Sequence, residues 1–256
     1  MERAVSPRPG GSSVLGKVQL ILESFSHDEQ HLSLSEIARR SGVAKASVHR
    51  LAQELLSWGV LERRGQNYGL GLRLFELGQR VPRQRILRDI ARPYMEDLHQ
   101  ATRETIHLSI PDGLDVLYLE KVYGHGHVAW PSRVAGRMPL HGPATGKVFL
   151  AFGPPSLLGE VLGAPLTRIT PHTVTTPTAL LAEMAQARKL GYVVESEQAR
   201  LGYVSVAVPL YGTTGPVMAA LSVTAPLHRA APVRYAALLH AVSPRFTRSI
   251  GATDFT

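Results

Sequence analysis

The chain has 256 residues, of which 44% are hydrophobic and 19% charged, and its formal net charge is +8. This length and apolar content suffice for two domains or one large one, and they argue against a mainly disordered chain. No cysteine is present, which excludes disulfides, thiolate catalysis and cysteine-based zinc or iron–sulfur sites. There is no run of about eighteen apolar residues that would span a membrane.

The N-terminal segment, residues 1–13, contains Pro7, Pro9, Gly10 and Gly11 and lacks the apolar region of a signal peptide. We expect a short disordered arm here. Together with the absence of cysteine, this segment predicts a cytoplasmic protein with no membrane partner.

The positive charge is concentrated in one segment. Residues 39–92 contain twelve Lys/Arg and four Asp/Glu, an excess of +8, whereas the rest of the chain balances sixteen against sixteen. A confined basic excess is typical of a surface that binds phosphates. A solvated basic face is the alternative when charge is considered alone.

Two helices are predicted near the N-terminus. Residues 14–26 place apolar side chains at helical spacing. In the next segment, the Ser33 side chain should accept from the amide of Glu36, and Glu36 should reach back to the amide of Ser33, as in a capping box. Gly42 supplies a left-handed stop, so a short helix is expected over residues 34–41.

A longer helix is predicted from Lys45 to the stop at Gly59, followed by two short strands at residues 60–64 and 67–70 around a turn. Its apolar face carries Val48, Leu51, Ala52 and Leu55. The short helix should bury Leu34, Ile37 and Ala38 against this face, which leaves the opposite side of the long helix free.

This order of elements predicts a winged helix-turn-helix, in which the second helix of the pair enters the major groove of DNA. Arginines of the hairpin should lie beside flanking phosphates. Ordinary surface polarity is the alternative for each side chain. The candidate DNA-binding residues are Lys45, Ser47, His49, Arg50, Gln53, Arg63 and Arg64.

A helical linker is predicted after the hairpin. Residues 72–80 form one helical pattern that breaks near Val81-Pro82, and a second pattern follows with Pro93 as an expected kink. The apolar positions of this second pattern are Ile86, Ile90, Tyr94 and Leu98.

The C-terminal half mixes strands and helices. Residues 104–110 and 116–123 should pair as a hairpin around a turn at residues 112–115. Helices are predicted at residues 143–152, 155–162, 178–190 and 232–250, and strands at 192–195, 203–210 and 217–225. The fold class is therefore α+β in two domains, with a mostly antiparallel sheet in the second. The predicted division is an arm at 1–13, a winged helix-turn-helix at 14–76, a linker helix at 77–100 and an effector-binding domain at 101–256.

The segment LSLSEIARRSGVAKASVHRLAQELLSWGVLERRGQNYGLGLRLFELG strongly resembles the DNA-binding half of the IclR family of regulators. Later segments resemble the effector domain of that family, in its order: MPLHGPATGKVFLAF, LGYVVESEQARLGYVSVAVPL and GPVMAALSVTAP. The resemblance extends from about Val14 to Ile250.

The resemblance implies a homo-oligomer, a dimer or a dimer of dimers, whose GAF-like C-terminal domain binds a small organic molecule, often a carboxylate or an aromatic acid. Carried over by position, the effector-binding residues are Ala144, Thr145, Gly146, Glu195, Ser205 and Ser222. The chain departs from the family at Glu197-Gln198, where two consecutive acids are frequent, and at Ser205, where some members carry cysteine.

Three of these features have alternative explanations. HGPATGK (141–147) is no P-loop, because His141 and Val148 occupy positions that require glycine and Ser or Thr. The helix start at Thr145 and Gly146 is expected to hold an anion, with tight packing of the glycine as the alternative. Ser205 and Ser222 contact either a ligand or the backbone. 

His125 and His127 resemble a pair of metal ligands, but nothing nearby supplies a third. We therefore expect no metal or cofactor.

The resulting hypothesis is a ligand-controlled regulator whose partners are a double-stranded DNA operator, a small effector and further copies of itself. One rival is an enzyme with a recruitment domain, although no catalytic motif such as G-x-S-x-G or H-E-x-x-H is present. Another is an architectural DNA-binding protein with a vestigial sensor.

Overall fold

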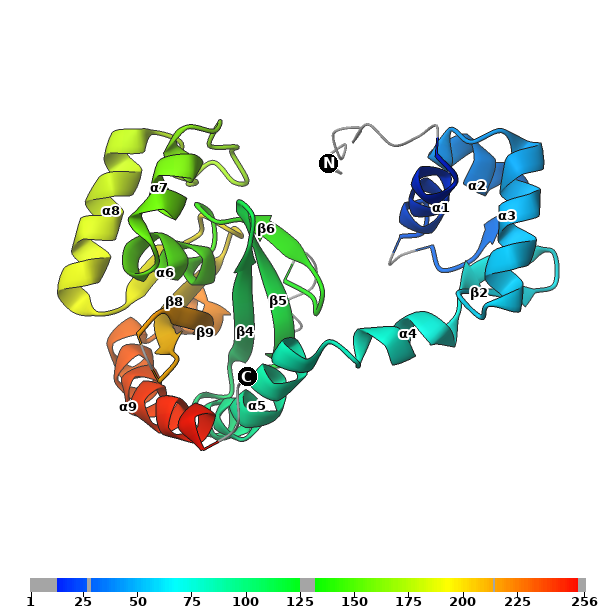
Figure 1. The fold of residues 1–256 in the computed structure, drawn as a ribbon. Coiled ribbons are helices and arrows are strands. Elements are labelled where there is room, and N and C mark those ends of the chain that lie inside the picture. Colours follow the sequence, from blue (N-terminus) through cyan, green and yellow to red (C-terminus); the bar gives the residue numbers. More distant parts are fainter. Residues whose placement is uncertain (1–12, 27–28, 125–131, 214, 253–256) are drawn as a thin grey trace. The chain divides into compact units, whose positions relative to one another are not determined.

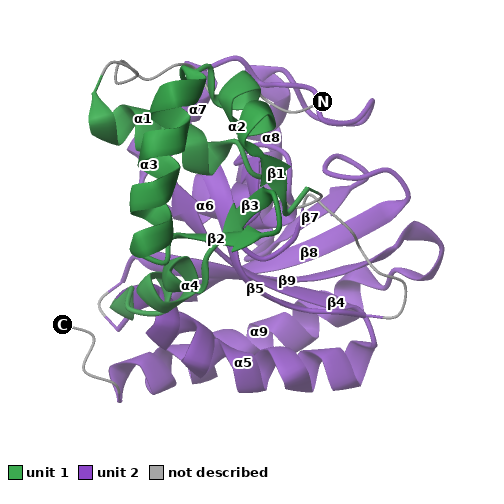
Figure 2. Ribbon diagram, turned by 90° about the vertical axis from the view of Figure 1, so that its right-hand side faces the viewer, with its two compact units in different colours: residues 1–82 green, residues 83–256 purple. Residues whose placement is uncertain are grey.

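The computed structural model describes residues 13–26, 29–124, 132–213 and 215–252 (Figure 1). The chain forms two units, one ending at Pro82 and one beginning at Arg83 (Figure 2). Among the described residues, no helix combines the length and the apolar character needed to cross a membrane.

The first unit is a winged helix-turn-helix. Its elements are α1 (Val14–Glu23), β1 (Leu32–Ser33), α2 (Leu34–Ser41), α3 (Lys45–Ser57), β2 (Leu61–Arg64), β3 (Asn67–Leu70) and α4 (Leu72–Gly78). The strands pair antiparallel in the order β1-β3-β2. The predicted order of elements is confirmed, but α1 ends three residues earlier than expected. Strand β1 was not predicted, because two residues are too few to show a pattern.

Helix α2 begins and ends where the sequence places it. The amide of Glu36 donates to Ser33 Oγ at 3.2 Å, and Gly42 adopts a left-handed φ of 68°. The second half of the capping box is wrong, since the Glu36 carboxylate accepts from Arg39 Nε at 2.9 Å and Arg40 Nε at 2.6 Å. Charge-assisted bonds to two guanidinium groups outcompete a neutral amide, and they lower the pKa of Glu36 to about 2.

The second unit is built on a six-stranded sheet, and the predicted antiparallel arrangement is confirmed. Its strands are β4 (Thr105–Asp112), β5 (Asp115–Val122), β6 (Arg137–Pro139), β7 (Val193–Ser196), β8 (Tyr203–Tyr211) and β9 (Val217–Pro226). They lie in the order β6-β5-β4-β9-β8-β7. The short edge strand β6 was not predicted, because its three residues contain proline and show no alternation.

Helices cover both faces of this sheet (Figure 1). One face packs against α5 (Pro82–Thr102) and α9 (Pro232–Gly251), and the other against α6 (Ala144–Phe152), α7 (Pro155–Leu162) and α8 (Pro177–Leu190). Along β4, Ile106 and Leu108 join the core beneath α5 and α9. Because strand residues alternate between faces, His107 and Ser109 point to the α6 side.

The predicted linker helix is in two parts. Helix α4 ends at Gly78, and α5 begins at Pro82, so the expected break near Val81-Pro82 is confirmed. Leu98 is buried as expected, but the rest of the expected apolar face of α5 is wrong by one residue: Leu87, Ala91 and Met95 are buried, whereas Ile90 and Tyr94 are only partly buried. Small Ala91 and flexible Met95 fit closer to the sheet. The helix continues through Pro93, which is exposed, so water can solvate the backbone there.

Candidate functional site

The outward face of α3 is the candidate DNA-contacting surface. Val48, Leu51, Ala52 and Leu55 are buried in the core of the first unit, as predicted. On the opposite side Lys45, His49, Arg50 and Gln53 are exposed, and Ser47 is half-buried. The cap residue Ala44 has no side chain that bonds to the first amides of α3, so these amides face outward beside Lys45.

Arg50 is held loosely. Its Nη1 lies 2.8 Å from Glu54 Oε1, and both side chains are more than 60% exposed. Exposed ion pairs at this spacing contribute little to stability. The guanidinium group can therefore leave Glu54 for a phosphate or a base edge at little cost.

The hairpin arginines are both exposed. Arg63 Nε donates to the carbonyl of Gly65 at 3.1 Å, and its guanidinium carbon lies 5.7 Å from the centre of the Tyr68 ring. Arg64 Nε lies 3.1 Å from Glu62 Oε1. The wing thus presents two cations on one short hairpin.

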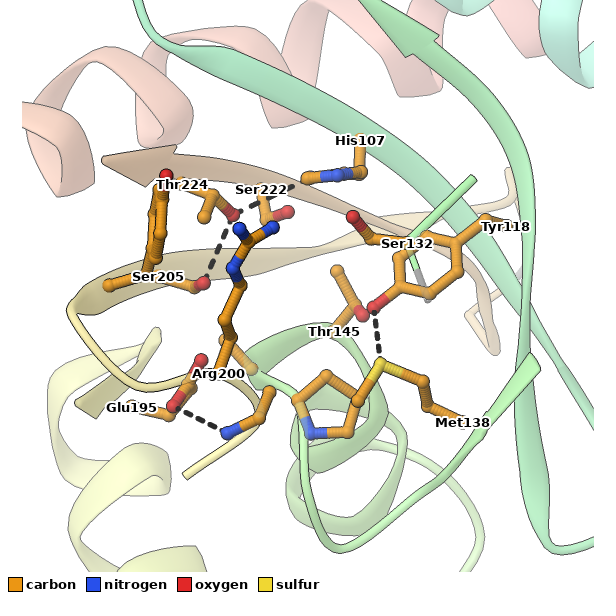
Figure 3. Close-up of a pocket in the computed structure, with 14 residues that line it drawn as sticks. His107, Tyr118, Ser132, Met138, Thr145, Glu195, Arg200, Ser205, Ser222 and Thr224 are labelled. Carbon is orange, nitrogen blue, oxygen red and sulfur yellow. Dashed lines mark hydrogen bonds between the residues drawn. The ribbon is translucent and has the colours of Figure 1, made fainter. Parts of the chain in front are cut away.

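The second unit contains a pocket between its sheet and the start of α6 (Figure 3). Its cavity volume is about 30 Å³ in this structure, so a small organic molecule can enter only when lining side chains move aside. Five of the six predicted effector-binding residues line it, and Gly146 does not. The lining residues are His107, Tyr118, Ser132, Met138, Pro143, Ala144, Thr145, Glu195, Ala199, Arg200, Tyr203, Ser205, Ser222 and Thr224.

Polar side chains on neighbouring strands form one wall of the pocket. Ser222 pairs with His107 across β9 and β4, and Ser205 pairs with Thr224 across β8 and β9. Ser205 Oγ lies 3.0 Å from Thr224 Oγ1. The alternation of the strands therefore places Ser205 and Ser222 on the same, pocket-facing side of the sheet.

Glu195 is buried at the end of β7. Its carboxylate accepts from the amides of Gln198 at 2.9 Å and Ala199 at 3.3 Å. Burial raises the pKa of Glu195 to about 7, although these amides and the charge of Lys147 act in the opposite direction. The pocket therefore carries less than a full negative charge near neutral pH.

Lys147 lies fully buried behind the pocket. Its ammonium group pairs with Glu183 of α8 and donates to Gln198 Oε1 at 2.5 Å. Gln198 Nε2 in turn donates to Glu183 Oε1 at 2.8 Å. Gln198, one of the departures from the family pattern, thus accepts from one charged partner and donates to the other.

Only part of the predicted effector-binding segment at the start of α6 lines the pocket. Ala144 and Thr145 line the pocket, whereas a Cβ on Gly146 would lie 2.4 Å from the carbonyl oxygen of Leu140. The glycine therefore permits close packing of backbone on backbone. The packing explanation fits Gly146 better than the expected anion contact.

One cation, Arg200, lines the pocket, and a second, Lys121, lies beside the lining residue Ser132. Figure 3 shows Arg200 extending across it, and its guanidinium carbon lies 4.6 Å from the centre of the Tyr203 ring. Lys121 Nζ lies 3.4 Å from Ser132 Oγ. Burial, together with the charge of Arg200, lowers the pKa of Lys121 to about 8. Because these two side chains are cationic and Glu195 carries less than a full negative charge, the pocket favours an anionic ligand.

Sequence reasoning missed several lining residues, including His107, Tyr118, Arg200 and Thr224. The alternation in the segment 104–110 carried a signal for His107, because it separates this residue from Ile106 and Leu108. Arg200 lies in a turn, where no periodicity applies. His125 and His127 lie outside the described residues, and elsewhere in the described chain no cluster of three potential metal ligands occurs.

A winged helix-turn-helix joined to a second domain with a polar pocket is typical of transcription regulators. The family model for the IclR helix-turn-helix domain matches residues 14–65, and that for the bacterial transcriptional regulator IclR C-terminal domain matches residues 79–245. The chain belongs to the IclR family: it is a DNA-binding transcription regulator and not an enzyme.

Known relatives and solved structures are similar to this chain over almost its whole length. The transcriptional regulator KdgR of Escherichia coli is 33% identical over 250 residues, covering 95% of this chain and 94% of KdgR. The structure of an IclR homolog from Microbacterium hydrocarbonoxydans, complexed with 4-hydroxybenzoate, is 35% identical with a TM-score of 0.88, covering 94% of this chain and all of that one. The IclR structure from Thermotoga maritima is 29% identical with a TM-score of 0.76, covering 93% and 97%.

Proposed function

We propose that this regulator binds its operator through α3 and the wing, and that a small carboxylate or aromatic acid in the second unit controls this binding. The pocket carries the proposal: Arg200 offers a positive charge, the strand hydroxyl groups offer hydrogen bonds, and Tyr118 and Tyr203 offer ring faces. That a relative was solved with 4-hydroxybenzoate supports an aromatic acid.

Control requires that the effector bind the DNA-competent and DNA-incompetent shapes with different affinities. The chain connecting the two units runs through α4 and α5, and the inner face of α5 packs on the same sheet whose other face lines the pocket. A shift of the sheet on ligand binding would therefore reach α5 directly.

On the DNA side, we propose that Lys45, Ser47, His49, Arg50 and Gln53 contact the major groove. Arg63 and Arg64 contact flanking phosphates. The protein acts as a homo-oligomer in the cytoplasm, where its DNA is, and two α3 helices read half-sites roughly 34 Å apart or a multiple of it.

Arg50→Ala tests the DNA surface. If Arg50 contacts a base or a phosphate, its loss should weaken binding to a selected operator by roughly 10- to 100-fold, as measured by fluorescence anisotropy. Arg92→Ala is the matched control, because Arg92 is equally exposed and pairs in the same way with Glu96, four residues along α5. Equal operator affinities of the two variants would contradict the assignment.

A screen of small carboxylates and aromatic acids tests the sensor. An acid that binds only the folded state should raise the melting temperature and change operator affinity. A change in neither quantity across the screen would favour an architectural DNA-binding protein with a vestigial sensor.

A further inference from the structure

His107 is the buried polar residue of the pocket that the proposed function does not use. It is only 2% exposed, and it lines the pocket from β4. Its Nδ1 lies 3.5 Å from Thr224 Oγ1, which is a long contact. Its Nε2 is buried and has no hydrogen-bond partner among the described residues.

The imidazole is neutral at physiological pH. Burial lowers the pKa of His107 to about 3, and the nearby charge of Lys121 acts in the same direction. A neutral ring cannot serve as the counter-ion of a carboxylate. The proposed function assigns this role to Arg200, which lines the same pocket (Figure 3).

A packing role alone does not account for this histidine. The ring centre lies 5.3 Å from that of Tyr118, whereas the neighbours Ile106 and Leu108 point to the other face of the sheet. A phenylalanine could fill the space of the imidazole. Burying the imidazole instead leaves Nε2 without a hydrogen-bond partner among the described residues, which costs free energy. A ligand atom would restore the missing hydrogen bond.

We propose that His107 is a specificity-determining contact of the effector pocket, and that its Nε2 hydrogen-bonds a hydroxyl group of the ligand. The inference rests on the proposed function. It narrows the effector from any carboxylate to a hydroxy acid, whose carboxylate meets Arg200 and whose hydroxyl group reaches the sheet.

A hydroxyl group suits this position better than other neutral groups. Neutral histidine carries one donor and one acceptor nitrogen, and which one is Nε2 depends on the tautomer. A hydroxyl group both donates and accepts, so it pairs with Nε2 in either tautomer. Ser222, which pairs with His107 across the strands, offers a second hydroxyl group of the same versatility.

The test is titration calorimetry of the full chain with matched pairs of acids: 4-hydroxybenzoate and 3-hydroxybenzoate against benzoate, and lactate against propanoate. We expect at least one hydroxy acid to bind wild type tenfold or more tightly than its partner. In His107→Phe the difference should fall below about twofold, while the acid without the hydroxyl group keeps its affinity. His107→Gln should restore part of the difference, because its amide also donates and accepts.

Ser109→Ala is the control for disturbing the sheet. Ser109 lies two residues along the same face of β4, its hydroxyl group is buried without a partner among the described residues, and it does not line the pocket. This variant should discriminate as wild type does. Cooperative melting of every variant shows that the fold is intact, and His107→Gln carries the test if His107→Phe does not fold.

Two results overturn the inference and leave the proposed function standing: wild type binds acids without regard to the hydroxyl group, or His107→Phe keeps the discrimination. If no acid binds wild type in either the calorimetry or the screen of small acids, acid sensing itself fails, and the role of His107 fails with it.

Discussion

Burial, more than neighbouring charges, determines the pKa values of two ionisable side chains at the pocket. Glu195 and His107 both lie at the pocket, and burial is the largest influence on the pKa of each. Both groups are thereby moved toward their neutral forms. The pocket therefore offers hydrogen bonds on the sheet side, with Arg200 as its cation.

The raised pKa of Glu195 predicts a pH dependence of stability. Below about pH 4.5 the carboxyl group is protonated in both states, and between pH 4.5 and 7 only the folded protein holds the proton. The free energy of unfolding should therefore fall as the pH rises through this window, by an amount on the order of 3 kcal/mol from this group.

Denaturant unfolding at several pH values measures this fall in the free energy of unfolding. In Glu195→Gln the part of the fall that comes from Glu195 should be absent. Glu160→Gln, at an exposed position of α7, should retain it. Parallel curves for wild type and Glu195→Gln would show that Glu195 does not hold a proton in the folded state.

Among individual residues of the pocket, sequence patterns could identify some but not others. Ser205 and Ser222 follow from the strand pattern and the family resemblance together. His107 meets Ser222 only because β4 lies beside β9, and the two strands are more than a hundred residues apart in the chain. Which strands become neighbours is a property of the whole sheet, and no local pattern encodes it.

Individual elements were the most predictable level of the structure. Capping and stop residues fixed α2, and apolar periodicity located the helices on both faces of the sheet. The failures have two causes. Strands β1 and β6 are too short to show a period. The buried face of α5 is determined by the sheet against which it packs, so tertiary packing overrode the local pattern there.

Helix α6 yields a prediction at this scale. Gly146→Ala should lower the free energy of unfolding by about 1–3 kcal/mol, because the new methyl group collides with the backbone of Leu140. This outweighs the gain of roughly 1 kcal/mol that alanine brings to a helix.

Gly159→Ala in α7 is the control, since a Cβ there meets nothing within 4 Å, and it should stabilise the protein. Urea denaturation distinguishes the two. A stabilising Gly146→Ala would contradict the packing explanation.

At the scale of the whole molecule, several large apolar side chains are exposed to solvent in a single copy of the chain. In the first unit Leu15 is 81% exposed, Leu72 69%, Phe75 63% and Trp58 60%. Trp58 and Leu72 border one shallow groove. A second copy covering them would support the proposed homo-oligomer.

Phe75→Glu should therefore weaken self-association, because a charge in an apolar interface is costly to desolvate. Sedimentation velocity should show a wild-type mass that is a multiple of 27.8 kDa and a shift toward the monomer in the variant. Leu181→Glu, on α8 of the second unit and 44% exposed, should leave the mass unchanged. A monomeric wild type, or a variant that associates as wild type does, would contradict the assignment.

The buried ammonium group of Lys147 binds three segments to one another. It extends from α6, its counter-ion comes from α8, and its amide partner comes from the turn after β7. If any one segment detached, a charge would remain in the interior without a partner, so partial opening is strongly disfavoured. In native-state hydrogen exchange, the amides of these three segments should therefore lose protection together, as one cooperative unit.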